Sequence, residues 1–479
     1  MRRVSIAAIM LLVVAGSGGR AQPVFTGAEI FPPEEFAARR AKIFDAIGDA
    51  VAALQGTAER PGEQPLRQNN QFFYLTGVVE PRALLWLDGR TRRATIYLQP
   101  NDERRQRQIE RMYGVGLVPG AEAARTTGLD AALPRAEFAA AVADAGRQRT
   151  TIYTTFRPEV LGSASAGEPA ALARATAADP WDGRASREDT FVAKLKAAAP
   201  HCTVRDLDPA IDALRAIKSP REIAVIREAT RLAGLGIVEA MRDARPGLFE
   251  YQLQADAEFV FKDGGAYGPA YFALIATGPN TLYSHYHKNT AALQDGDLVQ
   301  FDYAPDYNYY ASDVTRVFPA NGRFSPRQRE LYSIYLQLYR ALMTSIAVHA
   351  SPRDIVTAAV AKMDAAMAAY QFTDAEIRAA AAQFVDGYRT RRTVTSLGHS
   401  VGMEVHDVGG PPATLEPGMI FTIEPPLQLP DEHIGLRLED MILITDAGYE
   451  NLSASVPFEI DAVERTMKEP GLRSARPRR

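Results

Sequence analysis

The chain has 479 residues, of which 46% are hydrophobic and 23% charged, and its formal net charge is −4. These are ordinary globular values, and the length favours two domains or more. Without a long internal basic run we expect no nucleic-acid partner, and the single cysteine, Cys202, excludes an internal disulfide and a cysteine-rich zinc site.

The N-terminus has the pattern of a secretory signal peptide. Arg2 and Arg3 precede an apolar run from Val4 to Ala15, and Gly19-Arg20-Ala21 is a small-x-small cleavage motif. The apolar run is short for a membrane span, so an anchor is the weaker alternative. We expect residues 1–21 to be removed and the mature protein to be periplasmic or secreted, with no membrane association.

Residues 22–205 are predicted to form an N-terminal α/β domain. Periodicity rich in alanine and glutamate predicts a helix from Pro33 to Leu54. Three apolar segments predict buried strands: Gln71–Val78, Ala83–Leu87 and Ala94–Leu98. No catalytic set of side chains is evident in this part of the chain.

A second domain is predicted over residues 206–465. It begins with a linker helix at Asp206–Arg221, and a flexible basic tail follows it at 466–479. Ser219-Pro220-Arg221-Glu222 is a capping box that predicts the start of a helix. Further helices are predicted at Arg327–Val348, Arg353–Tyr370 and Thr373–Phe384. Strands are predicted at Tyr271–Thr277, Leu298–Tyr303, Ala311–Phe318, Met419–Glu424 and Leu436–Thr445. Because helices and strands do not alternate strictly, the fold class is α+β with an antiparallel sheet.

Two carboxylates, Asp302 and Asp313, lie in otherwise apolar strands on either side of a predicted turn at Pro305–Asn308. A buried carboxylate is costly unless another group neutralises it, and two neighbouring carboxylates repel each other. One or two divalent cations would resolve both problems. The alternative is a surface hairpin whose acids face water.

The second domain carries further polar residues in strand or glycine-rich contexts. They are His399 between glycines, His406 before Asp407, Glu424 at a strand end, and Arg437 with Glu439 on one face of a strand. Each alone has a structural explanation. Together, four acids and a histidine suit hard or borderline divalent metals, and four negative charges favour two cations over one. Two such ions can lower the pKa of a shared water from ~15.7 toward ~7.

These motifs resemble the pita-bread metallopeptidases, and within them the Xaa-Pro aminopeptidase (aminopeptidase P) and prolidase branch. The resemblance rests on Asp302, Ser312–Arg316, Gly398-His399, Val405–Gly409, Glu416–Pro425, Arg437–Asp440, and the segments Ser284–Asn289 and Asp295–Leu298. Gln71–Gly77 is similar to the creatinase-like first domain of that family. The resemblance covers most of the chain and implies a creatinase-like N-terminal domain followed by a pita-bread catalytic domain.

The resemblance also implies a ligand set for two metal ions. Asp302 would chelate one ion, Asp313 and Glu439 would bridge both, and His399 and Glu424 would hold the other. Mn²⁺ is the ion that the family suggests, with Zn²⁺ or Co²⁺ as alternatives.

Roles in catalysis follow from the same resemblance. Glu424 would steer protons for the metal-bridged hydroxide, and His285 and His406 would bind the scissile carbonyl and stabilise the tetrahedral intermediate. Arg437 would orient a ligand carboxylate. Thr395 stands where many members carry a histidine on the substrate side, which bears on peptide length preference and rate rather than on the metals.

The implied function is a dinuclear metallo-exopeptidase that hydrolyses the N-terminal Xaa-Pro bond of peptides with proline at the second position. The first alternative is a prolidase that acts on Xaa-Pro dipeptides. A non-catalytic binding protein and a creatinase-like, metal-free hydrolase are disfavoured because all five ligand positions are filled. A homo-oligomer is also implied by the resemblance.

Overall fold

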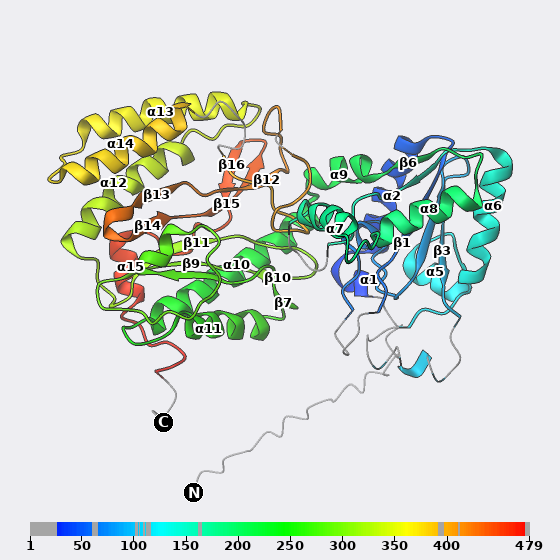
Figure 1. Ribbon diagram of the computed structural model, residues 1–479, viewed down its shortest axis with the longest axis horizontal. Helices are drawn as coiled ribbons and strands as arrows, with labels where there is room; N and C mark the ends of the chain where they lie inside the picture. The colour runs from blue at the N-terminus through cyan, green and yellow to red at the C-terminus, as the bar shows by residue number, and fades with distance from the viewer. Residues whose placement is uncertain are drawn as a thin grey trace, which may run out of the picture.

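The computed structural model describes residues 26–59, 66–100, 104, 106–108, 111, 116–160, 165–390, 397–410 and 412–474. The predicted signal peptide lies within residues 1–25, which are outside this part of the chain. Thr395 and residues 475–479 of the predicted tail also lie outside it. The described residues form two lobes that lie side by side (Figure 1). No helix among them is both long enough and apolar enough to cross a membrane.

The first lobe is a six-stranded sheet of order β4-β3-β2-β1-β5-β6, with helices on both faces. Its strands are β1 (Val51–Gln55), β2 (Leu84–Asp88), β3 (Arg93–Leu98), β4 (Ala131–Pro134), β5 (Ile152–Thr154) and β6 (Val204–Asp206). Its helices are α1 (Thr26–Ile30), α2 (Pro33–Ile47), α3 (Asn70–Thr76), α5 (Ala121–Thr127), α6 (Phe138–Gln148), α7 (Glu168–Ala178) and α8 (Arg187–Ala198), with a 3-10 turn η1 (Arg135–Glu137). The β1–β2 and β2–β3 pairs are antiparallel and the others are parallel.

Two predictions for this lobe are wrong. The helix predicted to reach Leu54 ends at Ile47, because Gly48 adopts a positive φ of 58° and its N–H caps the helix on the Phe44 carbonyl. Val51–Leu54 then form β1. The segment after Asn69 is helix α3 instead of a strand, since the Asn69 side chain caps its start and Gly77 at φ 67° ends it. A short apolar run does not distinguish strand from helix, so the caps decide.

The connection between the lobes is α9 (Asp208–Ala216), which is shorter than the predicted linker helix. The next helix, α10 (Pro220–Asp243), begins with the predicted capping box: Ser219 and Glu222 each bond the backbone N–H of the other. This prediction is confirmed.

The described part of the second lobe is built from small antiparallel sheets. Its strands are β7 (Gly268–Pro269), β8 (Leu274–Thr277), β9 (Leu298–Asp302), β10 (Pro305–Asp306), β11 (Thr315–Pro319), β12 (Ile420–Ile423), β13 (Pro426–Leu429), β14 (Ile434–Arg437), β15 (Asp440–Thr445) and β16 (Gly448–Asn451). The sheets are β11-β9-β8, β12-β15-β16, β13-β14 and β10-β7. Its helices are α10, α11 (Glu250–Asp263), α12 (Pro326–Met343), α13 (Pro352–Ala369), α14 (Ala375–Thr390) and α15 (Ile460–Thr466), with 3-10 turns η2 (Gly278–Leu282) and η4 (Pro430–Glu432). Helices α12–α14 lie on one side of the strands and α10 and α11 on the other (Figure 1).

The predicted α+β class with antiparallel sheets is therefore confirmed. One predicted strand, Leu436–Thr445, is instead two. Strand β14 pairs with β13, whereas β15 pairs with β12 and β16, so the chain changes sheets at Leu438 and Glu439. This change of sheet places Glu439 beside Thr315 of β11, with which it forms an isolated bridge.

Candidate metal centre and active site

Strand ends bring the five predicted ligand residues to one place. Asp302 ends β9, Asp313 lies two residues before β11, and Glu424 directly follows β12. Glu439 lies between β14 and β15, and His399 precedes the bridge of Ser400 to Phe421. Three overlapping groups have ligand atoms within 4.8 Å of one another: Asp302–Asp313–Glu439, His399–Glu424–Glu439 and Asp313–His399–His406.

The ring of His399 faces the carboxylates through Nε2. That atom lies 3.4 Å from an oxygen of Asp313, 3.4 Å from one of Glu424 and 3.8 Å from one of Glu439. The other ring nitrogen, Nδ1, lies 3.2 Å from the carbonyl oxygen of Ser400, which can only accept. A neutral ring therefore carries its proton on Nδ1 and turns the lone pair of Nε2 toward the acids, the arrangement of a metal-binding histidine.

The electrostatics of the acids favour a bound cation. Burial, and then the charges of Asp302 and Glu424, raise the pKa of Asp313 well above its ordinary value. Burial, followed by Asp313 and Glu424, does the same to the pKa of Glu439. Protein groups alone therefore do not stabilise these carboxylates in their charged form.

One carboxylate oxygen of Glu439 shows whether these residues fit a bound metal ion. Its Oε2 accepts a hydrogen bond from the Thr315 hydroxyl at 2.7 Å, whereas its Oε1 is buried and has no hydrogen-bond partner among the described residues. A buried acceptor without a partner costs about 1–3 kcal/mol, and more when it is charged. The orphaned oxygen lies 3.8 Å from His399 Nε2, so the residues present fit divalent cations held among them.

Tyr271 belongs to the site, although sequence reasoning assigned it no role there. Its hydroxyl lies 2.6 Å from Asp302 Oδ1 and 2.7 Å from Asp313 Oδ1. A phenol has one proton, so it can donate to only one of these carboxylates at a time. The pKa of Tyr271 is raised by burial and then by Asp302 and Asp313. The only sequence signal was its position at the start of the predicted strand Tyr271–Thr277, of which Leu274–Thr277 form β8 and pair with β9.

Arg437 lies beside the predicted ligand Asp302. Its guanidinium forms an ion pair with Asp302 and also donates to the carbonyl oxygen of Ser284 at 3.3 Å. Burial opposes the charge of Arg437, but Asp302 and then Glu439 outweigh it and raise its pKa. Asp302 is thus held by Arg437 on one oxygen and by Tyr271 on the other.

The two predicted substrate histidines lie beside this cluster. The ring centroids of His406 and His399 are 4.0 Å apart, and those of His406 and His285 are 6.4 Å apart. Burial, then the neighbouring His399 and His285, lowers the pKa of His406 to about 4. A neutral His406 carries one ring N–H with which to donate to an oxygen. His406 also lies within ligand reach of Asp313, a proximity that the sequence did not predict.

A cavity of about 300 Å³ opens onto the cluster. The five predicted ligands, both histidines, Tyr271 and Arg437 line it, together with Ser165 and Glu168 of the first lobe. The N–H of Ala166 donates to the carbonyl oxygen of His406 at 2.9 Å, which ties the two lobes together at this point. The first lobe, for which no site residue was predicted, therefore supplies one wall of the site.

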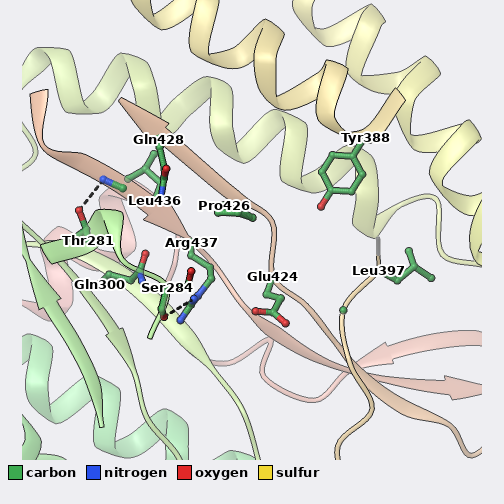
Figure 2. Close-up of a pocket in the computed structure, with 12 residues that line it drawn as sticks. Thr281, Ser284, Gln300, Tyr388, Leu397, Glu424, Pro426, Gln428, Leu436 and Arg437 are labelled. Carbon is green, nitrogen blue, oxygen red and sulfur yellow. Dashed lines mark hydrogen bonds between the residues drawn. The ribbon is translucent and has the colours of Figure 1, made fainter. Parts of the chain in front are cut away.

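A second cavity, of about 270 Å³, adjoins the first at Glu424 and Arg437, which line both. Figure 2 shows Glu424 and Arg437 among its lining residues, with Tyr388 from α14 and Leu397 opposite them. Thr281, Ser284, Gln300 and Gln428 make part of its wall polar. Glu424 is the accessible acid here: its side chain is 29% exposed, against 1% for Glu439.

Comparison with known proteins matches both lobes. Residues 224–446 match the model of metallopeptidase family M24, and residues 36–153 match the aminopeptidase P N-terminal domain. The Xaa-Pro aminopeptidase of Escherichia coli (strain K12) is 32% identical over 456 residues, which cover 90% of this chain and 97% of that protein. The Xaa-Pro aminopeptidase of Haemophilus influenzae is 30% identical and covers 91% of this chain and 97% of its own length.

Solved structures agree with these matches. Proline aminopeptidase P II from Yersinia pestis superposes with a TM-score of 0.70 at 31% identity, over 91% of this chain and 99% of that one. A zinc-substituted Escherichia coli aminopeptidase P in complex with product has a TM-score of 0.70 at 28% identity, over 91% and 98% of the two chains. The same enzyme with the inhibitor Pro-Leu has a TM-score of 0.69 at 29% identity, over the same shares.

Proposed function

Because this chain belongs to metallopeptidase family M24, with Xaa-Pro aminopeptidases as relatives along nearly its whole length, we propose that it removes the first residue from peptides with proline at the second position. It is a metal-dependent exopeptidase whose fold joins an N-terminal domain of aminopeptidase P type to an M24 catalytic domain. The observation that carries the proposal is the convergence of four acids and His399 on one cavity.

Two divalent cations are held by Asp302, Asp313, His399, Glu424 and Glu439 in this proposal. When bound, they supply Lewis-acid polarisation of the scissile carbonyl and lower the pKa of a water that attacks it. We propose Mn²⁺ because a ligand set of carboxylates with a single imidazole suits it. The alternatives are Co²⁺ and Zn²⁺, the latter bound by the zinc-substituted relative.

In this proposal His285 and His406 bind the scissile carbonyl, and Glu424 transfers the proton. An Xaa-Pro bond has no amide N–H, so the carbonyl oxygen is the group of that bond that a site can hold. His406 and His285 line the cavity and donate to that oxygen as its charge grows. The accessible carboxylate of Glu424 takes a proton from the attacking water and delivers it to the leaving proline nitrogen. The ammonium of the substrate lies near the acids.

The test is an assay of the purified mature protein with Mn²⁺ on an Xaa-Pro-Xaa tripeptide and on an Xaa-Pro dipeptide. We expect cleavage of the tripeptide that is lost with a chelator and in Glu424→Gln. Glu416→Gln, which removes a carboxylate that pairs with His349 on the surface, is the matched control and keeps activity. Cleavage of the dipeptide alone would establish a prolidase instead, and no metal-dependent cleavage of either would reject both.

Export and assembly are separate proposals. We propose that residues 1–21 direct the protein to the periplasm or outside the cell, on the strength of the basic start, apolar run and cleavage motif. N-terminal sequencing of the protein recovered from the periplasm or medium should begin at Gln22. The homo-oligomer implied by the resemblance is tested by light scattering on the purified protein.

A further inference from the structure

The first lobe contains a cavity of about 670 Å³ that shares no lining residue with the cavity at the metal centre. It lies between the ends of β1 and β2, the turn η1 and helices α6 and α8, and we call it the N-lobe cavity. Its apolar lining includes Leu84, Phe138, Val142, Phe191 and Leu195. This volume is within the range of about 300–1,000 Å³ for sites that bind small molecules.

Four cationic side chains line the same cavity: Arg82, Arg135, Arg187 and Lys194. Two of them have carboxylate partners, Arg82 with Glu59 at 2.5 Å and Arg187 with Glu159 at 2.8 Å. The other two have no ion pair with any described residue. The cationic side chains that line the N-lobe cavity therefore outnumber their carboxylate partners by two.

Arg135 is one of the two lining cations that have no ion pair with a described residue. Its Nε donates to the carbonyl oxygen of Arg82 at 3.0 Å, and its two terminal nitrogens bond no described acceptor. Partial burial, then the charges of Arg82 and Arg187, lower the pKa of Arg135. Arg82 and Arg187, which line the same cavity, thus oppose the charge of Arg135, and a bound anion would offset this repulsion.

A further unsatisfied donor lies in the wall. The side chain of Gln55 lines the cavity, and its amide nitrogen is buried without a hydrogen-bond partner among the described residues. Buried donors normally have a partner. The wall thus combines donors and positive charge with an apolar interior.

We propose that the N-lobe cavity binds a small organic anion, with a carboxylate or phosphate head against Arg135 and Lys194 and an apolar body along Phe138 and Phe191. Planar guanidinium groups recognise both kinds of head group in the same way. An inorganic ion would leave the apolar surface uncovered, and a neutral apolar molecule would leave the charges unrelieved. The chemistry therefore requires both parts in one ligand.

The protein carries a reporter for this test. Of its two tryptophans, Trp86 is buried with its ring 5.8 Å from that of the cavity residue Phe138, whereas Trp181 is 97% exposed. In full-length Trp181→Phe protein, fluorescence reports on Trp86 alone. We expect saturable changes with octanoate and with octyl phosphate. The tighter of the two identifies the preferred head group, and octanol should bind at least tenfold more weakly than that one.

Charge variants make the test specific. Arg135→Gln should weaken the binding of octanoate and octyl phosphate at least tenfold, whereas Arg149→Gln, which removes a positive charge from the same lobe outside the cavity, should leave it unchanged. Because Arg135 is exposed, its variant should not lower the thermal unfolding midpoint or the peptidase activity of the parent. The proposal is overturned if neither anion binds saturably, if octanol binds as tightly, or if both arginine variants lose binding equally.

Discussion

Thr315 and Glu439 are joined by three hydrogen bonds. Their backbones exchange two, with N–H to O distances of 3.3 and 3.1 Å, and the Thr315 hydroxyl donates to the Glu439 carboxylate at 2.7 Å. Thr315 begins the strand that follows Asp313, and Glu439 lies where the chain passes from one sheet to the next. This pair therefore sets the distance between the two acids predicted to bridge the metals.

Thr315→Val removes the hydroxyl while keeping the shape and both backbone bonds. We expect Mn²⁺ affinity to fall about 10- to 100-fold, the usual effect of losing a group that orients a metal ligand. Titration of activity with Mn²⁺ measures it, and activity at saturating metal should largely recover. Thr414→Val, which removes a comparable bond to Glu416, is the control and should leave affinity unchanged. Equal effects from both variants would contradict the role of Thr315.

Tyr271→Phe tests whether the phenol hydroxyl stabilises Asp302 and Asp313, both of which it contacts. Without the hydroxyl, Asp302 and Asp313 lose their common donor, and Arg437 and bound metal ions remain to offset the two charges. We expect the thermal unfolding midpoint of the metal-free variant to fall by several degrees, and that of the Mn²⁺-loaded variant to fall less. Tyr267→Phe, on a half-exposed tyrosine nearby in sequence, should change neither. An equal loss with and without metal would show that Tyr271 only supports packing.

Glu168 places a negative charge on the wall of the active-site cavity that the first lobe supplies. Its exposed carboxylate lines the active-site cavity, so it should favour substrates with a basic first residue. We expect Glu168→Gln to lower the ratio of kcat/KM for Lys-Pro-Xaa over Glu-Pro-Xaa peptides about threefold to fivefold, as about 1 kcal/mol of charge interaction in water implies. Glu122→Gln, on the surface of α5, should leave the ratio unchanged. An unaltered ratio in Glu168→Gln would place the substrate away from this wall.

Glu80 makes stability depend on pH. Burial raises its pKa from 4.5 to about 7, although the N–H of Leu117 bonds its carboxylate and opposes the rise. The folded protein therefore holds this proton more tightly than the unfolded chain, and the associated stability, present below pH 4.5, is lost as pH rises through about 7. The loss amounts to about 3 kcal/mol at ~1.4 kcal/mol per pKa unit.

Glu80→Gln removes the titration and can still accept the bond from Leu117. Urea unfolding at pH 5 and pH 8 measures the effect. Relative to the parent, the variant should gain about 2–3 kcal/mol of stability at pH 8 beyond any change at pH 5. A parallel shift at both pH values would show that Glu80 does not titrate in this range.

Much of the metal centre could be predicted because its acids lie at the ends of strands that the sequence marks clearly. The structure brings Asp302, Asp313, His399, Glu424 and Glu439 together, with His285, His406 and Arg437 around them. The metal ligation and catalytic roles of these residues remain predictions that the experiments above test.

What the sequence did not predict depends on contacts between distant segments. Tyr271 reaches two acids that lie 31 and 42 residues further along the chain, and nothing local connects them. The wall at Ser165 and Glu168 depends on how the lobes pack. The missed helix α3 is an apolar run whose conformation is decided by its caps, Asn69 and Gly77.

Anomalous scattering from crystals grown with Mn²⁺ would show whether the acid cluster holds paired cations. We expect two peaks in the anomalous difference map, both within ligand distance of Asp313 and Glu439. A map with no peak at this cluster, from protein that is active with Mn²⁺, would contradict this expectation.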